Sequence, residues 1–104
     1  MLGHGGELLS YALQNRIFAS GHTALTVPGS GSLTTATVNV AGIAKTTDVI
    51  LLTLDLNGLL GTVTMNELPF VGSIVDTTSF AAVFSLDNSD PADQTVFLNW
   101  VVFR

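Results

Sequence analysis

Apolar side chains occupy every second position near the C-terminal end of the chain, and this spacing constrains the fold more than any other feature. The alternation in residues 80–86 is carried by Phe80, Ala82, Phe84 and Leu86. Successive side chains of a strand point to opposite faces, so a period of two predicts a half-buried β-strand. In residues 95–103 both faces carry large apolar groups. That pattern predicts a central strand, or one with a face against a partner.

Further strand patterns, separated by turn-forming residues, extend over the chain from residue 17 onward. Residues 34–40 alternate apolar side chains with Thr and Asn, which is typical of a half-buried strand. Residues 47–55 are nearly all apolar, which predicts a central strand covered on both faces. Residues 68–75 contain Pro and Gly and are predicted to form an edge strand or a packed loop. Six to eight such strands, without long intervening helices, predict one all-β domain. We expect an antiparallel β-sandwich or a jelly roll, with a small barrel as the alternative.

One segment before the strands has helical spacing. Leu9, Leu13 and Ile17 recur at intervals of four, with an acidic residue near the start of the segment and a basic one near its end. About three helical turns are marginal alone, so this arm needs a surface to pack on, in its own sandwich or in a neighbouring subunit. The predicted organisation is a flexible N-terminus in residues 1–6, a short helix or arm in residues 7–16, and the β-sandwich in residues 17–104.

The chain carries few charged side chains. They make up 11% of its 104 residues, against about 25% in a typical soluble domain. Charged residues are depleted where protein surfaces bury against partners, so the deficit predicts a surface largely covered in an assembly. The alternative is a monomeric β protein with a neutral coat of Thr and Ser. The net charge is −5 and only three residues are basic, so no nucleic-acid or membrane partner is expected.

No catalytic constellation is recognisable, and we expect no enzymatic activity. The absence of Cys excludes disulfides, thiolate catalysis and Cys-ligated zinc. Neither His4 nor His22 has an acidic residue or a second His at ligand spacing. The best candidate for a metal site is the loop with Asp87, Asp90 and Asp93, whose carboxylates could bind Ca²⁺ although the EF-hand pattern is missing. The alternative is an ordinary turn. No cofactor is expected apart from this Ca²⁺.

Two stretches of the chain resemble bacteriophage virion proteins. Residues 8–18 (LLSYALQNRIF), followed by residues 23–28, are similar to the short helix and Thr-rich strands that open small phage head and tail proteins. Residues 80–84 (FAAVF) and 97–103 (FLNWVVF) are similar to the closing strands of phage fibre, decoration and H-type-lectin-like sandwiches. The resemblance implies a homo-oligomer, often a trimer, that is attached to a capsid or tail. Its location is then the virion, after assembly in the host cytoplasm.

The composition and the resemblance together favour a virion structural protein, a capsid decoration (cement) protein or a tail or fibre subunit. Its expected partners are further copies of the chain and other virion proteins, such as the major capsid or tail protein. The predicted interface residues are outward-facing apolar ones: Leu8, Leu9, Tyr11, Leu13, Phe70, Phe97 and Phe103.

Two other functions remain open at this point. The first is a lectin-like carbohydrate-binding module, with Ca²⁺ in the acidic loop as a possible aid. Such a module needs an exposed aromatic side chain, for which Trp100 and Tyr11 are the candidates. Trp100, however, alternates in step with the apolar face of its strand and is interpreted as a core residue. The second is a β domain that belongs to a larger protein.

Overall fold

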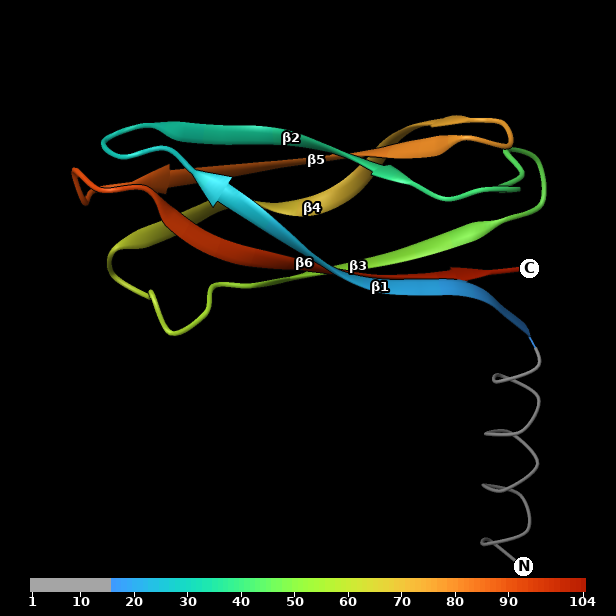
Figure 1. Ribbon diagram of the computed structural model, residues 1–104, viewed down its shortest axis with the longest axis horizontal. Coiled ribbons are helices and arrows are strands. Elements are labelled where there is room, and N and C mark those ends of the chain that lie inside the picture. Colours follow the sequence, from blue (N-terminus) through green and yellow to red (C-terminus); the bar gives the residue numbers. More distant parts are fainter. Residues whose placement is uncertain (1–15) are drawn as a thin grey trace, which may run out of the picture.

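The structure, a computed structural model, describes residues 16–104 and contains six strands there. They are β1 (Ile17–Val27), β2 (Ser32–Asn39), β3 (Val49–Asp55), β4 (Val63–Val75), β5 (Ser79–Asn88) and β6 (Gln94–Phe103). All pair antiparallel, in a first sheet of order β1-β6-β3 and a second sheet of order β2-β5-β4. Figure 1 shows the two sheets as two layers. The prediction of an all-β domain with antiparallel strands is confirmed.

The N-terminal predictions lie almost entirely outside the described part of the chain. This holds for the flexible residues 1–6 and for the helix predicted in residues 7–16, of which Arg16 alone is described. Among residues 16–104, no helix is long and apolar enough to cross a membrane.

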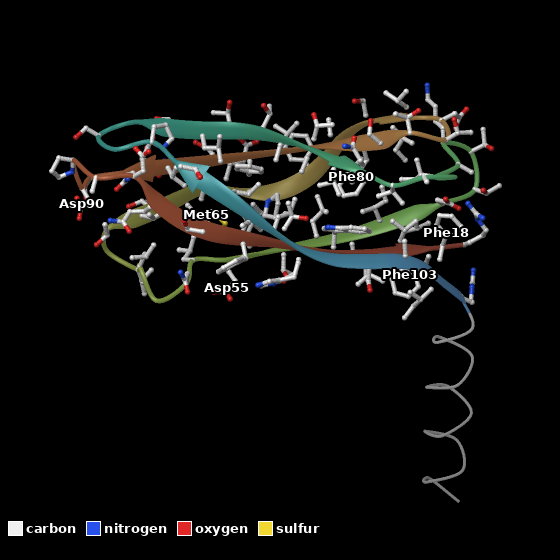
Figure 2. All side chains as sticks on the ribbon, in the orientation of Figure 1. Phe18, Asp55, Met65, Phe80, Asp90 and Phe103 are labelled. Atoms are coloured by element: carbon white, nitrogen blue, oxygen red, sulfur yellow. The ribbon has the colours of Figure 1, made fainter. Side chains whose placement is uncertain are left out.

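The core lies between the two sheets and is built mainly by their central strands. The buried apolar side chains of β5 and β6 are Phe80, Ala82, Phe84, Leu86, Val96, Leu98, Trp100 and Val102. Phe80 lies between the layers (Figure 2) and meets Trp100 edge-on, with 5.7 Å between the ring centroids. The indole Nε1 of Trp100 donates a hydrogen bond to Thr23 Oγ1 at 3.0 Å. The interpretation of Trp100 as a core residue is therefore confirmed.

β3 is an edge strand, so the prediction of a central strand for residues 47–55 is wrong. The first sheet pairs β3 with β6 on one side, and no other strand in residues 16–104 pairs with its second side. Every second side chain of β3 packs against the core, but Val49 and Leu51 between them are 60% and 57% exposed. The run is therefore apolar on both faces, although no layer of the described chain covers the outer face of β3.

β4 contains residues 68–75, the predicted edge strand or packed loop, and begins before them at Val63. It is an edge strand of the second sheet, as the Pro and Gly in that segment predict. Its pairing with β5 is irregular at three places, and Gly72 belongs to one of them. A Cβ atom at Gly72 would lie 2.7 Å from Val83 Cγ2, so the two strands approach so closely there that a side chain does not fit.

An ion pair closes the end of the molecule where the described chain both begins and ends. Arg104 donates from Nε to Asp48 Oδ1 and from Nη2 to Oδ2, both at 3.0 Å. Nη2 also donates to Gly42 O at 2.8 Å, and the guanidinium lies 3.6 Å from the centroid of the Phe18 ring. The backbone N–H of Ala44 donates to Asp48 Oδ2 at 2.8 Å. These bonds satisfy a buried carboxylate and attach the β2–β3 loop to the last residue.

The stability of the domain is expected to depend on the charge of Asp48. The hydrogen bond from Arg104, together with that from Ala44, holds the pKa of Asp48 below its usual value although desolvation opposes it. A carboxyl whose pKa is lowered on folding stabilises the protein above its unfolded pKa of about 4, and this stabilisation is lost as the pH falls through the folded pKa. We expect Asp48→Asn to lower the melting temperature at pH 7.

The acid profile of Asp48→Asn is the direct measurement, with thermal unfolding followed by circular dichroism at each pH. Between about pH 5 and pH 2 its melting temperature should fall less steeply than that of the unsubstituted chain, because one linked carboxyl is missing. Asp55→Asn is the matched control, since Asp55 lies exposed at the end of β3. Equal slopes for Asp48→Asn and the unsubstituted chain would contradict the assignment.

Candidate interaction surface

The outer face of the first sheet carries a continuous apolar surface at the end where β1 begins and β6 ends. We call it the apolar patch, and its residues are Ile17, Val49, Leu51, Val101 and Phe103. The strand pairing places Ile17 and Val49 on either side of Phe103, and Leu51 beside Val101. Ile17, Val49 and Leu51 are 43%, 60% and 57% exposed. Val101 and Phe103 are half-buried by these neighbours.

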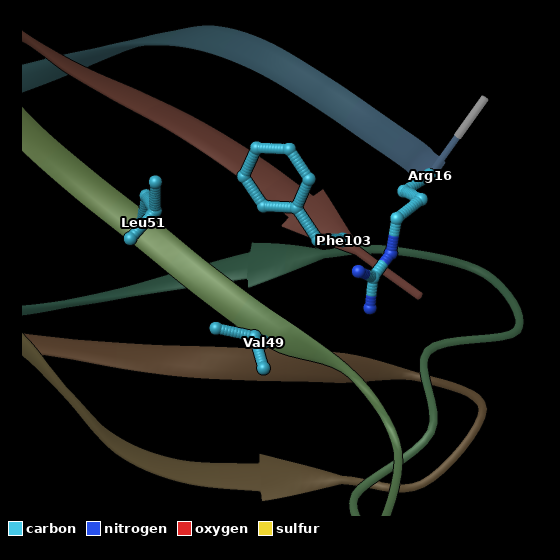
Figure 3. A pocket seen from close by; sticks show the side chains of 4 residues that line it. All are labelled: Arg16, Val49, Leu51 and Phe103. Carbon is cyan, nitrogen blue, oxygen red and sulfur yellow. The ribbon is translucent and has the colours of Figure 1, made fainter. Parts of the chain in front are cut away.

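A hollow of about 290 Å³ lies within the apolar patch. Its lining residues are Arg16, Val49, Leu51 and Phe103 (Figure 3). Apart from the charged Arg16, the lining side chains are aliphatic or aromatic. They offer no acid, nucleophile or metal ligand, so the surface is suited to bury apolar groups of a partner. Fully burying a Val or Leu side chain stabilises by about 1.5–3 kcal/mol. Covering the exposed parts of Val49 and Leu51 would thus contribute roughly 1 kcal/mol each.

The same face becomes polar beyond the apolar patch. The His22 ring stacks on Phe97, with 4.2 Å between the ring centroids and 16° between the ring planes. His22 Nδ1 is also hydrogen-bonded to Asn99 Oδ1. Figure 2 shows Asp55 on this outer side, as it does Phe103. The apolar patch is therefore bordered by polar groups, which is the usual anatomy of a protein–protein interface.

The structure brings together only some of the predicted interface residues. Phe97 and Phe103 lie on the outer face of the first sheet. Phe70 is 48% exposed but belongs to β4 in the second sheet, where it pairs with Val83. The remaining predicted residues, Leu8, Leu9, Tyr11 and Leu13, lie outside the described part of the chain.

Sequence reasoning missed the most exposed members of the apolar patch, Val49 and Leu51. The signal was present, because the run in residues 47–55 is apolar on both strand faces. Such a run fits a strand covered on both faces equally well, and by itself it predicts that structure. Only the two-layer arrangement, in which the second sheet covers one face of the first sheet and no described layer covers the other, shows that one face of β3 is exposed.

The acidic loop predicted to bind Ca²⁺ uses its carboxylates within the fold. Asp87, on the outer face of the second sheet, accepts hydrogen bonds from Ser32 Oγ and Asn66 Nδ2, both at 2.6 Å. These two bonds, that from Ser32 first, lower the pKa of Asp87. Asp90 Oδ1 accepts a hydrogen bond from the N–H of a residue two positions later, at 2.8 Å. Asp93 Oδ1 accepts one from Gly29 N at 2.9 Å.

The bonds of Asp90 and Asp93 belong to the turn between β5 and β6, whereas Asp87 lies at the end of β5 and bonds to residues of β2 and β4. Residues 16–104 contain no cluster of three acidic, His or Cys side chains that could hold a metal ion. Calcium binding by Asp87, Asp90 and Asp93 stays a prediction from the sequence pattern, without further support from the geometry.

Comparison of the chain with family models, with curated proteins and with solved structures finds no match. The features of the chain that bear on its function are therefore its sequence pattern and the apolar patch.

Proposed function

We propose that the chain is a virion structural protein, a self-assembling subunit that decorates a capsid or forms part of a tail or fibre. The observation that carries this proposal is the apolar patch, whose members Val49 and Leu51 are more than half exposed. Contiguous exposed apolar surface bordered by polar residues marks sites of protein association. An isolated domain would gain nothing from this surface, whereas a subunit can bury it against another copy or a virion protein.

Composition supports the same proposal. Only 11% of the residues are charged, and the exposed faces rely on Thr, Ser and Asn instead. Surfaces depleted in charge are typical of subunit interfaces. The phage-like sequences at residues 80–84 and 97–103 lie in β5 and β6, the two central strands. The described chain forms two three-stranded layers, so it has fewer strands than the eight-stranded jelly roll of many viral capsid domains. The trimer remains the favoured oligomer, by resemblance alone.

The carbohydrate-binding alternative has less support. Its platform would be an exposed aromatic ring. Trp100 is buried and Phe97 is stacked against His22, so Phe70, 48% exposed, is the most open aromatic side chain of residues 16–104. Its Ca²⁺ site would use the acidic loop, whose carboxylates accept hydrogen bonds from three different parts of the fold.

The first test is the absolute mass in solution, measured by light scattering after size exclusion over a wide range of concentrations. We expect a fixed multiple of the 10.9 kDa chain mass. Leu51→Glu should weaken association about 100-fold or more, because burying an unpaired carboxylate in the interface costs about 3 kcal/mol or more. Thr35→Glu is the control, since it adds the same charge to an exposed position of β2 in the second sheet. Its mass should be unchanged.

A monomer at every concentration would contradict the assembly on which the proposal depends.

The virion location has its own test. Mass spectrometry of particles banded in a density gradient, from a host that carries the gene, should detect peptides of this chain at a stoichiometric level. Their absence from particles that contain the major capsid protein would count against a role in the virion.

A further inference from the structure

We propose that β3 forms an antiparallel pair with β3 of a second copy of the chain, across a two-fold axis at Leu51, so that two first sheets become one continuous sheet. This inference rests on the proposed self-assembly and names its contact. It is carried by three observations on β3: a free edge, regular geometry and an apolar outer face.

The free edge of β3 is the first observation. In the described chain, β3 has one strand neighbour, β6, on one side. A strand at a sheet edge presents a row of backbone N–H and C=O groups that can pair with another strand. Adding a strand to such an edge is a common mode of protein recognition, because the main-chain hydrogen bonds provide affinity whatever the partner.

The geometry of β3 distinguishes it from the other three edge strands. The pairing of β3 with β6 runs without a shift over seven consecutive residues. By contrast, β1 is irregular between Ile17 and Ala19, β2 between Leu33 and Thr35, and β4 at three places. Natural edge strands are protected against pairing by bulges, Pro or charges. β4 has such devices, but residues 49–54 of β3 contain no Pro, Gly or charged side chain.

The apolar face of β3 determines which partner fits. A two-fold axis at Leu51 places Leu51 opposite its own copy and Val49 opposite Thr53 of the second copy. This register keeps outer side chains opposite outer ones, because paired residues of two strands point to the same face. The apolar patches of the two copies then meet across the axis. Leu51 then contacts its own copy laterally, and the two patches form one larger apolar surface on the outer face of the joined sheet, related by the two-fold symmetry of an isologous interface.

Charge favours the same register. Asp55 is the only charged residue of β3, and it lies four positions from Leu51. The two copies of Asp55 would be eight residues apart along the joined strands, or about 26 Å. That distance is well beyond the screening length of about 8 Å at physiological salt, so the repulsion between these two carboxylates is small. An axis at Leu52 would instead place Asp55 opposite the apolar Val49.

The contact is compatible with more than one assembly. By itself, a two-fold pair of β3 strands gives a dimer. In an assembly built on trimers, the same contact would join trimers in pairs.

Disulfide trapping tests the contact directly, because the full chain has no Cys and each introduced Cys is therefore the only one. We expect Leu51→Cys to form a covalent dimer under mild oxidation, seen on a non-reducing gel. Opposed Cβ atoms of antiparallel strands are about 4.5–5.5 Å apart, close to the spacing that a disulfide needs. The yield should be at least about tenfold higher than the yield from Thr35→Cys. Thr35 is the exposed control on the edge strand β2, for which no pairing is expected.

The register is tested by two further variants. Val49→Cys and Thr53→Cys should each cross-link poorly alone but well when the two proteins are mixed, because the proposed axis places residue 49 opposite residue 53. This mixed pair also tests the contact if Leu51→Cys fails to fold, which its melting curve would show.

The failure of this inference can be distinguished from that of the proposed function. Suppose that light scattering shows an oligomer but Leu51→Cys and the mixed pair cross-link no better than Thr35→Cys. This result would overturn β3 pairing and leave self-assembly intact. If Val49→Cys or Thr53→Cys alone gave the highest yield of covalent dimer, the axis at Leu51 would be overturned. A monomer at every concentration would overturn both proposals.

Discussion

Replacing Phe80 with alanine should lower the free energy of unfolding by about 3–5 kcal/mol, the usual cost of removing a fully buried Phe side chain. Phe80 has no exposed surface and meets Trp100 across the two layers, with 5.7 Å between the ring centroids. The substitution removes apolar burial and leaves a cavity between the sheets that the rigid strands β5 and β6 can close only in part. Small domains have about 5–15 kcal/mol of stability in total, so this loss is a large part of it.

Urea unfolding followed by tryptophan fluorescence suits this measurement, because Trp100 is the only Trp of the chain and is itself in the core. Phe70→Ala is the matched control: it removes the same atoms from a side chain that is 48% exposed. Its cost should be about 1–2 kcal/mol, since only part of the side chain leaves water on folding. Equal losses for the two variants would contradict a core shared by the two layers.

Replacing Gly29 with alanine is the second substitution with a large expected effect, a loss of about 3 kcal/mol. A Cβ atom at this position would lie 2.0 Å from the carbonyl oxygen of Pro91. The obstacle is backbone, which cannot rotate away as a side chain would, so the two loops must separate. Separation would disturb the hydrogen bonds from Gly29 N to Asp93 Oδ1 and from Ser30 N to Asp90 O, of 2.9 and 2.8 Å.

The same two loops are joined through Asn88, which is buried at the end of β5. Its side-chain amide lies within 3.0–3.2 Å of the carbonyl oxygens of Val27, Pro28 and Ala92. Moving the loops apart would leave some of these groups without partners. Each unsatisfied buried group costs about 1–3 kcal/mol.

Gly31→Ala is the control for the Gly29 substitution, because it adds the same methyl group in the same loop. The nearest atoms to its added Cβ are Cγ and the carbonyl oxygen of Pro28, both at 3.3 Å, and this spacing needs a shift of only a few tenths of an ångström. Thermal unfolding should show a much smaller loss for Gly31→Ala than for Gly29→Ala. If the two melting temperatures fell equally, the close approach of the two loops at Gly29 would be refuted.

The stability of the domain and its proposed assembly involve different parts of the chain. The core residues of β5 and β6 hold the two layers together, whereas the apolar patch on the outer face of the first sheet contributes little to the isolated domain. Substitutions at Leu51 should therefore change the mass in solution far more than the melting temperature of the monomer, and substitutions at Phe80 should change mainly the melting temperature.

Local sequence determined which residues form strands and which face of the central strands is buried. The alternation in β5 and β6 predicted their core faces because a strand has a period of two, and that period is a local property of the backbone. The composition of residues 87–93 predicted a turn for the same kind of reason, since Asp, Asn and Pro favour turns wherever they occur.

Strand order was decided by the tertiary structure. The first sheet pairs β1 with β6, so that His22 lies beside Asn99, 77 positions away, and β3 remains at the edge. An apolar run such as residues 47–55 looks the same whether a layer of its own chain or another molecule covers it, because periodicity reports which side chains are apolar and not what they meet. The ion pair of Asp48 with Arg104 was likewise not predictable, since it joins residues 56 positions apart. Long-range pairing is chosen by the packing of the whole core, and that choice left the apolar patch exposed.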